Sequence, residues 1–197
     1  MYYDRLTRLL HLLIALGIVG QLMNALVMIH PKPGRMGDGF YAAHEAPGQV
    51  LLGLLMLHWR WRMARPGPVA FVRLFPWFSP LACRELFADG QRYLACMRRF
   101  SLPHDPVSAP LASAVQGVGL LMATLLGISG TLIFWTMAPG VKMTGWLHAV
   151  KELHEGLGIG MWCYLLLHAG MGMAHQMAGH ATLSRMFRFR EQESEQG

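Results

Sequence analysis

The stretch LHAVKELHEGLGIGMWCYLLLHAGMGMAHQM, residues 147–177, decides the fold. It is apolar over more than the roughly 20 residues that an α-helix needs to cross a membrane. Two of its four histidines, His154 and His168, lie 14 residues apart well inside the stretch. Fourteen steps of about 100° return to within about 40° of the start and climb about 21 Å, so the two rings share one face at two depths. Ionisable residues inside a span are usually functional, so the stretch predicts a membrane helix with chemistry on one face.

Three further stretches are long and apolar enough to span a membrane, which predicts an all-α protein built as a four-helix transmembrane bundle. The spans are expected at about residues 6–29, 40–59, 111–135 and 147–177, separated by segments rich in proline and glycine. Only 14% of the chain is charged and 53% is hydrophobic, whereas soluble domains carry about a quarter charged residues. We therefore expect one transmembrane domain over residues 1–190, followed by a polar tail at 191–197.

The basic residues are distributed unevenly between the two sides of this bundle. Most of the 17 lysines and arginines lie before the first span, between the second and third, or after the fourth. Because cytoplasmic loops are enriched in basic residues, both termini and the long loop between helices 2 and 3 are expected in the cytoplasm. The net charge of +6 is thus an orientation signal, and we expect no nucleic-acid partner. Residues 81–100 of the loop suit either a helix on the membrane surface or a solvated loop.

Two further histidines are expected at the depths of His154 and His168. His44 opens the second span on the outer side, level with His154, and His11 opens the first span on the cytoplasmic side, level with His168. Two imidazoles fill both axial positions of a haem iron, which favours electron transfer over oxygen chemistry. The pattern predicts two haem b groups, an outer one bound by His44 and His154 and an inner one bound by His11 and His168, with no catalytic residue.

The residue four positions after each predicted ligand is small. A residue at this spacing lies over the ligand on the same helix face. These residues are Ala15, Gly48, Gly158 and Gly172. They would leave room for a flat macrocycle, although small residues also simply favour close helix packing.

Two other histidines leave alternatives open near the inner site. His58 lies 14 residues after His44, so it could replace His11 as the inner ligand or contact a haem propionate or a quinone. His175 lies seven residues after His168 and could also bind a quinone carbonyl or a propionate. Both residues could equally be ordinary interfacial histidines.

Other metal sites are disfavoured by the residues available. A zinc or di-iron centre in a bundle would need inward carboxylates at Glu-x-x-His spacing, and the inner parts of the spans lack them. The cysteines, Cys83, Cys96 and Cys163, form no CxxC pattern, so free thiols are expected.

The sequence resembles the bacterial cytochrome b561 family and the related cytochrome b subunits of membrane hydrogenases and formate dehydrogenases. The matching strings are RLLHLL around His11, AAHEAPG around His44, LHEGLG around His154, and YLLLHAGMGMAH, which contains His168 and His175. In that family the residues matching His44 and His154 hold the outer haem, and those matching His11 and His168 hold the inner one. The resemblance implies a multi-pass protein of the bacterial cytoplasmic membrane.

The resemblance also implies electron transfer with the quinone pool as substrate. The chain has a long middle loop and the string SGTLIFW at residues 129–135, and both features resemble those of cytochrome b subunits of larger enzymes. The redox partner of such a subunit is a c-type cytochrome, a hydrogenase or a dehydrogenase. Some small stand-alone members carry a histidine early in the third span, where this chain has Ser113 and Gln116. A stand-alone superoxide–quinone oxidoreductase is therefore the alternative to a respiratory subunit. A non-redox membrane scaffold is a further alternative, from a different functional class.

Overall fold

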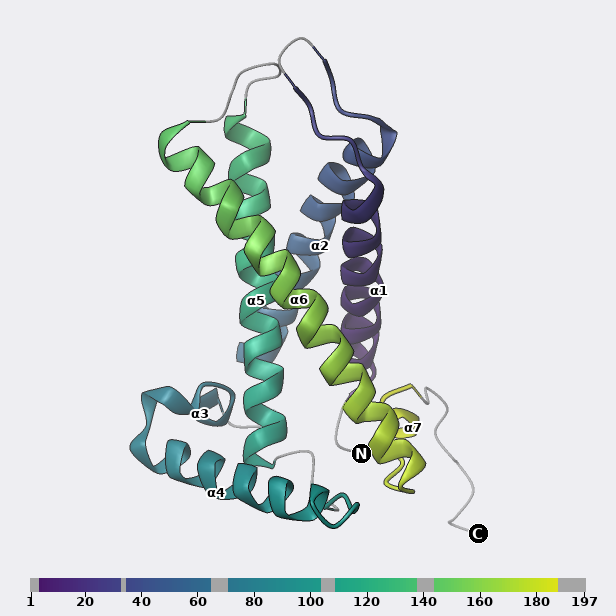
Figure 1. The fold of residues 1–197 in the computed structure, drawn as a ribbon, viewed down its shortest axis with the longest axis vertical. Helices are drawn as coiled ribbons and strands as arrows, with labels where there is room; N and C mark the ends of the chain where they lie inside the picture. The colour runs from purple at the N-terminus through teal and green to yellow at the C-terminus, as the bar shows by residue number, and fades with distance from the viewer. Residues whose placement is uncertain (1–3, 33–34, 65–70, 104–108, 138–143, 188–197) are drawn as a thin grey trace. The chain divides into compact units, whose positions relative to one another are not determined.

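The computed structural model describes residues 4–32, 35–64, 71–103, 109–137 and 144–187. In these ranges the chain is almost entirely helical and contains no β-strand beyond one isolated bridge between Lys32 and Arg35. The elements are α1 (Arg5–Val27), α2 (Gly39–Ala64), α3 (Phe71–Leu74), a short 3-10 helix η1 (Pro76–Phe78), α4 (Pro80–Met97), α5 (Pro110–Thr136), α6 (Gly145–Met177) and α7 (Thr182–Phe187) (Figure 1). The all-α prediction is confirmed, and the predicted tail at 191–197 lies outside the described residues.

Four of these helices coincide with the predicted spans. Within the part of the chain that the structure describes, α1, α5 and α6 are long and apolar enough to cross a membrane. Helix α2 is long but is not among the three, and it carries Glu45 near its start with Arg60 and Arg62 near its end. The passage of α2 through the membrane therefore stays a prediction.

The chain divides into two compact units. The bundle unit comprises Leu10–Arg65 and Val118–Leu165, which include α2 and most of α1, α5 and α6. The loop unit comprises Met1–Leu9, Pro66–Gly117 and Leu166–Gly197, which include α3, η1, α4, α7, the start of α5 and the end of α6.

The core of the bundle unit takes one residue from each long helix. Leu22 of α1, Leu55 of α2, Ala123 of α5 and Met161 of α6 are buried together. Side chains that face away from this core are large and apolar yet exposed, such as Leu16, Val50 and Ile159. Large exposed apolar surfaces are rare on soluble proteins, so this distribution suits a bundle surrounded by lipid.

Small and polar residues bring the helices of the bundle unit together. A Cβ at Gly119 would lie 2.1 Å from the hydroxyl oxygen of Tyr164, so a larger residue here would force the Tyr164 ring of α6 to move. The indole of Trp59 donates to Thr124 at 3.0 Å and links α2 to α5. Close glycine contacts and interhelical hydrogen bonds are the usual means of packing helices in a membrane.

In the loop unit, α4 confirms that a helix forms within residues 81–100. Ser79 accepts from the N–H of Ala82 and caps the helix, and Pro80 occupies its first position. Buried Asp89 binds Arg92 at 2.7 Å and accepts from the N–H of Leu111 at 3.0 Å, so it caps α5. That α4 lies on the membrane surface stays a prediction.

Candidate functional site

The structure brings together the predicted outer pair of histidines. His44 lies in the first turns of α2 and His154 lies in α6, and their ring centroids are 6.1 Å apart at an interplanar angle of 87°. Imidazole–metal bonds are about 2.0–2.1 Å, so two axial rings on one metal have centres roughly 6 Å apart. Both rings are half-buried. The pair therefore has the spacing that bis-histidine ligation of a haem iron requires.

The ring of His154 is seated against helix α5. Its Nδ1 lies 2.9 Å from the hydroxyl oxygen of Ser129. The hydroxyl of Ser129 donates its proton to the carbonyl of Leu125 at 2.7 Å. The next residue, Gly130, lacks a side chain where a Cβ would come within 3.1 Å of Cε1 of His154. The Ser129–Gly130 step thus supplies both a polar partner and the space for the ring.

The ring of His44 is held from helix α1. In the orientation that satisfies both ends of its amide, Gln21 donates from its nitrogen to Nδ1 and to the carbonyl of His44, each at 2.9 Å. The amide oxygen of Gln21 accepts from the N–H of Gly48 at 3.1 Å. One glutamine therefore contacts the ring, the backbone and the following turn of the His44 segment.

Pro47 interrupts the hydrogen bonding of the same turn. It has no N–H, so the carbonyl of Ala43 loses its partner four residues on. Asn24, three residues after Gln21 on α1, donates to this carbonyl at 3.2 Å. The polar residues of α1 thereby satisfy the backbone that the proline leaves open beside His44.

The small residues predicted to flank a haem leave space in different degrees. A Cβ at Gly158 would meet nothing within 4 Å, and one at Gly48 would only reach Gln21 at 3.9 Å. At Gly172 the nearest atom is a methyl carbon of Leu183 at 3.4 Å, and Ala15 is half-buried. Open space at Gly48 and Gly158, on the two helices that carry His44 and His154, suits a flat group beside these ligands.

The predicted inner ligands lie in different units. His11 and His58 are half-buried residues of the bundle unit, on α1 and α2. His168 is a half-buried residue of α6 that belongs to the loop unit. Pairing of His168 with either of the other two stays a prediction.

His175 lies in a hydrogen-bonded cluster at the end of α6. The hydroxyl of Tyr93, on α4, is 3.3 Å from its Nε2, and Nδ1 of His180 is 2.8 Å from its Nδ1. Gly179, with φ of 84°, closes a Schellman turn in which the N–H of His180 donates to the carbonyl of His175 at 3.0 Å. Such a turn frequently brings two apolar side chains together, and here the two positions are histidines in contact with each other.

A site could also be formed by a cluster of metal-binding side chains, by cysteines or by a pocket. The described residues contain no group of three or more His, Cys, Asp or Glu side chains that could hold a metal ion. The three cysteines are free thiols.

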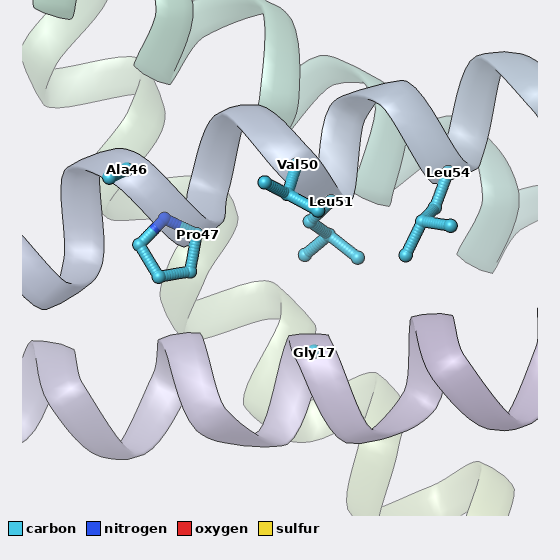
Figure 2. A pocket seen from close by; sticks show the side chains of 6 residues that line it. All are labelled: Gly17, Ala46, Pro47, Val50, Leu51 and Leu54. Atoms are coloured by element: carbon cyan, nitrogen blue, oxygen red, sulfur yellow. The ribbon is translucent and has the colours of Figure 1, made fainter.

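Figure 2 shows an apolar pocket between α1 and α2. It is lined by Gly17, Ala46, Pro47, Val50, Leu51 and Leu54. Its lining suits a hydrocarbon chain.

Long apolar helices, together with two histidine rings that α2 and α6 bring close to each other, define the class of helical membrane proteins with a paired-histidine site. The chain belongs to the prokaryotic cytochrome b561 family, because the model of that family matches residues 2–189. No curated protein and no solved structure matched the chain. Family membership makes it a multi-pass membrane cytochrome that binds haem b and transports electrons.

Sequence reasoning missed the residues around the two facing rings. Gln21 and Asn24 are amides within an apolar span, which was a signal available in the sequence. Ser129 and Gly130 had no such signal, because serine and glycine are common in membrane helices.

Proposed function

We propose that the chain is a di-haem cytochrome that carries electrons across the bacterial cytoplasmic membrane between a protein redox partner and the quinone pool. The observation that supports this most strongly is the 6.1 Å separation of the rings of His44 and His154. Their roles as axial ligands are part of the proposal, as is the outer position of the haem they hold.

The inner haem is held in this proposal by His168 and His11, with His58 as the alternative to His11. The 14-residue spacing from His154 to His168 supports two depths on one helix, about 21 Å apart along its axis. Haem supplies one-electron chemistry when bound. The four histidines would hold the two haems, and bis-histidine ligation would favour electron transfer over oxygen chemistry.

Quinone chemistry is proposed at the cytoplasmic end, near His175. Reduction of a quinone takes up two electrons and two protons, so the site needs groups that can donate hydrogen bonds and protons. Tyr93 and His180 contact the two ring nitrogens of His175, which supports a proton-exchanging role for this histidine.

The proposed orientation places both termini and the segment from α3 to α4 in the cytoplasm. The excess of arginine in that segment supports it. The length of the same segment supports a subunit of a larger complex, in which a c-type cytochrome, a hydrogenase or a dehydrogenase docks. A stand-alone superoxide–quinone oxidoreductase is the second candidate, and purification with or without a partner protein separates the two.

Spectroscopy of the purified protein with quinol tests the proposal. The detergent-solubilised cytochrome is mixed anaerobically with short-chain ubiquinol or menaquinol, and the reduced-minus-oxidised spectrum is compared with that from dithionite. We expect a b-type spectrum in which at least one of the two quinols reduces a large fraction of the haem. A protein that is fully reduced by dithionite but by neither quinol would contradict quinone as the substrate.

A further inference from the structure

The hydroxyl of Ser129 fixes which nitrogen of His154 carries the proton. A serine hydroxyl has one proton to donate and can accept through its lone pairs. The oxygen of Ser129 lies 2.7 Å from the carbonyl oxygen of Leu125 and 3.2 Å from that of Leu126. Two oxygens 2.7 Å apart repel unless a proton lies between them, so the hydroxyl proton is used by the backbone of α5.

Toward His154 the same hydroxyl can then act only as an acceptor. Its oxygen is 2.9 Å from Nδ1 of His154, so this nitrogen must carry the proton that is donated. A neutral imidazole protonated on Nδ1 has a bare lone pair on Nε2, which is the form that binds a metal. Ser129 is 4% exposed, so water hardly competes for these bonds.

Gln21, which contacts the ring of His44, does not require Nδ1 of that ring to carry the proton. Gln21 satisfies both ends of its amide when its nitrogen donates to Nδ1 of His44, which places the ring proton on Nε2. An amide can also turn its oxygen toward this nitrogen, so Gln21 can accommodate either tautomer of His44. The two rings are prepared differently although they face the same space.

We propose that Ser129 is a positioning residue for the outer haem, which holds His154 as the Nδ1–H tautomer and directs its bare Nε2 toward the iron. This inference rests on the proposed function, since it takes His154 to be an axial ligand. Gly130 contributes by leaving the space in which the ring reaches the hydroxyl.

Removal of the acceptor has a defined consequence for the haem. Donation from Nδ1 makes an imidazole a more basic ligand, which stabilises the ferric state. Ser129→Ala should raise the midpoint potential of the outer haem and weaken its binding roughly 10–100-fold. If only the binding of ferric haem is weakened, each tenfold loss of that affinity raises the midpoint potential by about 59 mV.

The test compares four variants by redox titration and by the rate of haem transfer to excess apomyoglobin. Ser129→Ala should raise the potential of the haem that is lost in His154→Ala, and it should speed transfer of that haem. Ser129→Thr keeps a hydroxyl that can bond the carbonyl four residues back, and it should restore wild-type values. Thr136→Val removes the similar bond from Thr136 to the carbonyl of Leu132 at an exposed site of α5, and it should change neither value.

A second variant keeps the test decisive if Ser129→Ala does not fold. Gly130→Ala retains the hydroxyl but places a methyl group 3.1 Å from the ring of His154, so it should raise the same potential. Wild-type potential and transfer rate in Ser129→Ala, or in Gly130→Ala if only that variant folds, would overturn the inference. Wild-type protein without bis-histidine haem would instead overturn the proposed function on which it rests.

Discussion

The ring centroids of His44 and His154 lie 6.1 Å apart with the rings nearly perpendicular, and each ring is contacted at its Nδ1 by a residue of a different neighbouring helix. Gln21 of α1 holds the first and Ser129 of α5 holds the second. All four long helices therefore contribute to one site. The same helices supply one residue each to the buried core of the bundle unit, so packing of the core and placement of the ligands depend on each other.

A close backbone contact in the loop unit should be sensitive to a single methyl group. A Cβ at Gly117 would lie 2.0 Å from the carbonyl oxygen of Leu74, and backbone cannot move aside as a side chain can. Gly117→Ala should lower the free energy of unfolding by about 1–3 kcal/mol. Gly90→Ala is the matched control, because a Cβ there meets nothing within 4 Å and alanine favours the helix. Thermal unfolding in detergent measures both, and equal stability of the two variants would refute the contact.

The start of α2 should contribute a pH-dependent stability. The N–H groups of Tyr41 and Ile29 donate to the carboxylate of Asp38 at 2.9 and 3.1 Å. The bond from Tyr41, the largest cause, holds the pKa of Asp38 below its ordinary value. A lowered pKa in the folded state means that the stabilisation is complete above the ordinary aspartate pKa and is lost as the pH falls through the lowered one.

Asp38→Asn should remove this dependence, since asparagine also caps helices but does not titrate. The stability difference between wild type and variant, followed by thermal unfolding from neutral to acidic pH, should shrink as the pH falls. A difference that stays constant down to the lowest pH would show that the carboxylate is not engaged.

The orientation of the protein can be read from its cysteines. Cys83 is exposed on α4, which we place in the cytoplasm, whereas Cys163 is exposed on α6, a helix long and apolar enough to span the membrane. A membrane-impermeant maleimide should label Cys83 in inverted vesicles and not in intact spheroplasts. A Cys163-only variant, with Cys83 and Cys96 replaced by serine, should stay unlabelled in both preparations. Labelling of Cys83 from the outside would reverse the orientation.

The histidine cluster at the end of α6 should matter for quinol and not for an artificial reductant. His175→Ala removes the group that contacts both Tyr93 and His180, and loss of such a proton-exchanging group slows a reaction by on the order of 10²-fold. Stopped-flow reduction by quinol should slow accordingly, while reduction by dithionite stays at the wild-type rate. His148→Ala, which alters an exposed histidine of the same helix, serves as the control. Equal slowing with both reductants would point to a haem defect instead.

The helices could be predicted from the sequence because a membrane span leaves a strong local signal. Apolar stretches of sufficient length predicted α1, α5 and α6, and the mixed segment at 81–100 was resolved as helix α4. The sequence also predicted that His44 and His154 lie at the same depth. This was possible because the rise per residue of a helix gives the distance of each residue from the end of its span. Helix α2 gave a weaker signal, since charged residues occupy both of its ends.

The partners of the histidines could not be predicted, because they depend on rotation of one helix against another. Ser129 reaches His154 and Gln21 reaches His44 only once the faces of α5 and α1 are set by packing. No spacing within one helix encodes that rotation. Gly119 and Gly158 illustrate the same point, because both are glycines of membrane helices but only the first is closed off by a neighbouring side chain.

Haem stoichiometry in ligand variants tests the central claim most directly. The pyridine haemochrome assay on purified protein, normalised to chain concentration, should give two haem b per chain in the wild type. It should give one in His44→Ala and in His154→Ala, and two in the control His148→Ala. A wild-type protein with no haem, or both ligand variants retaining two, would contradict the account.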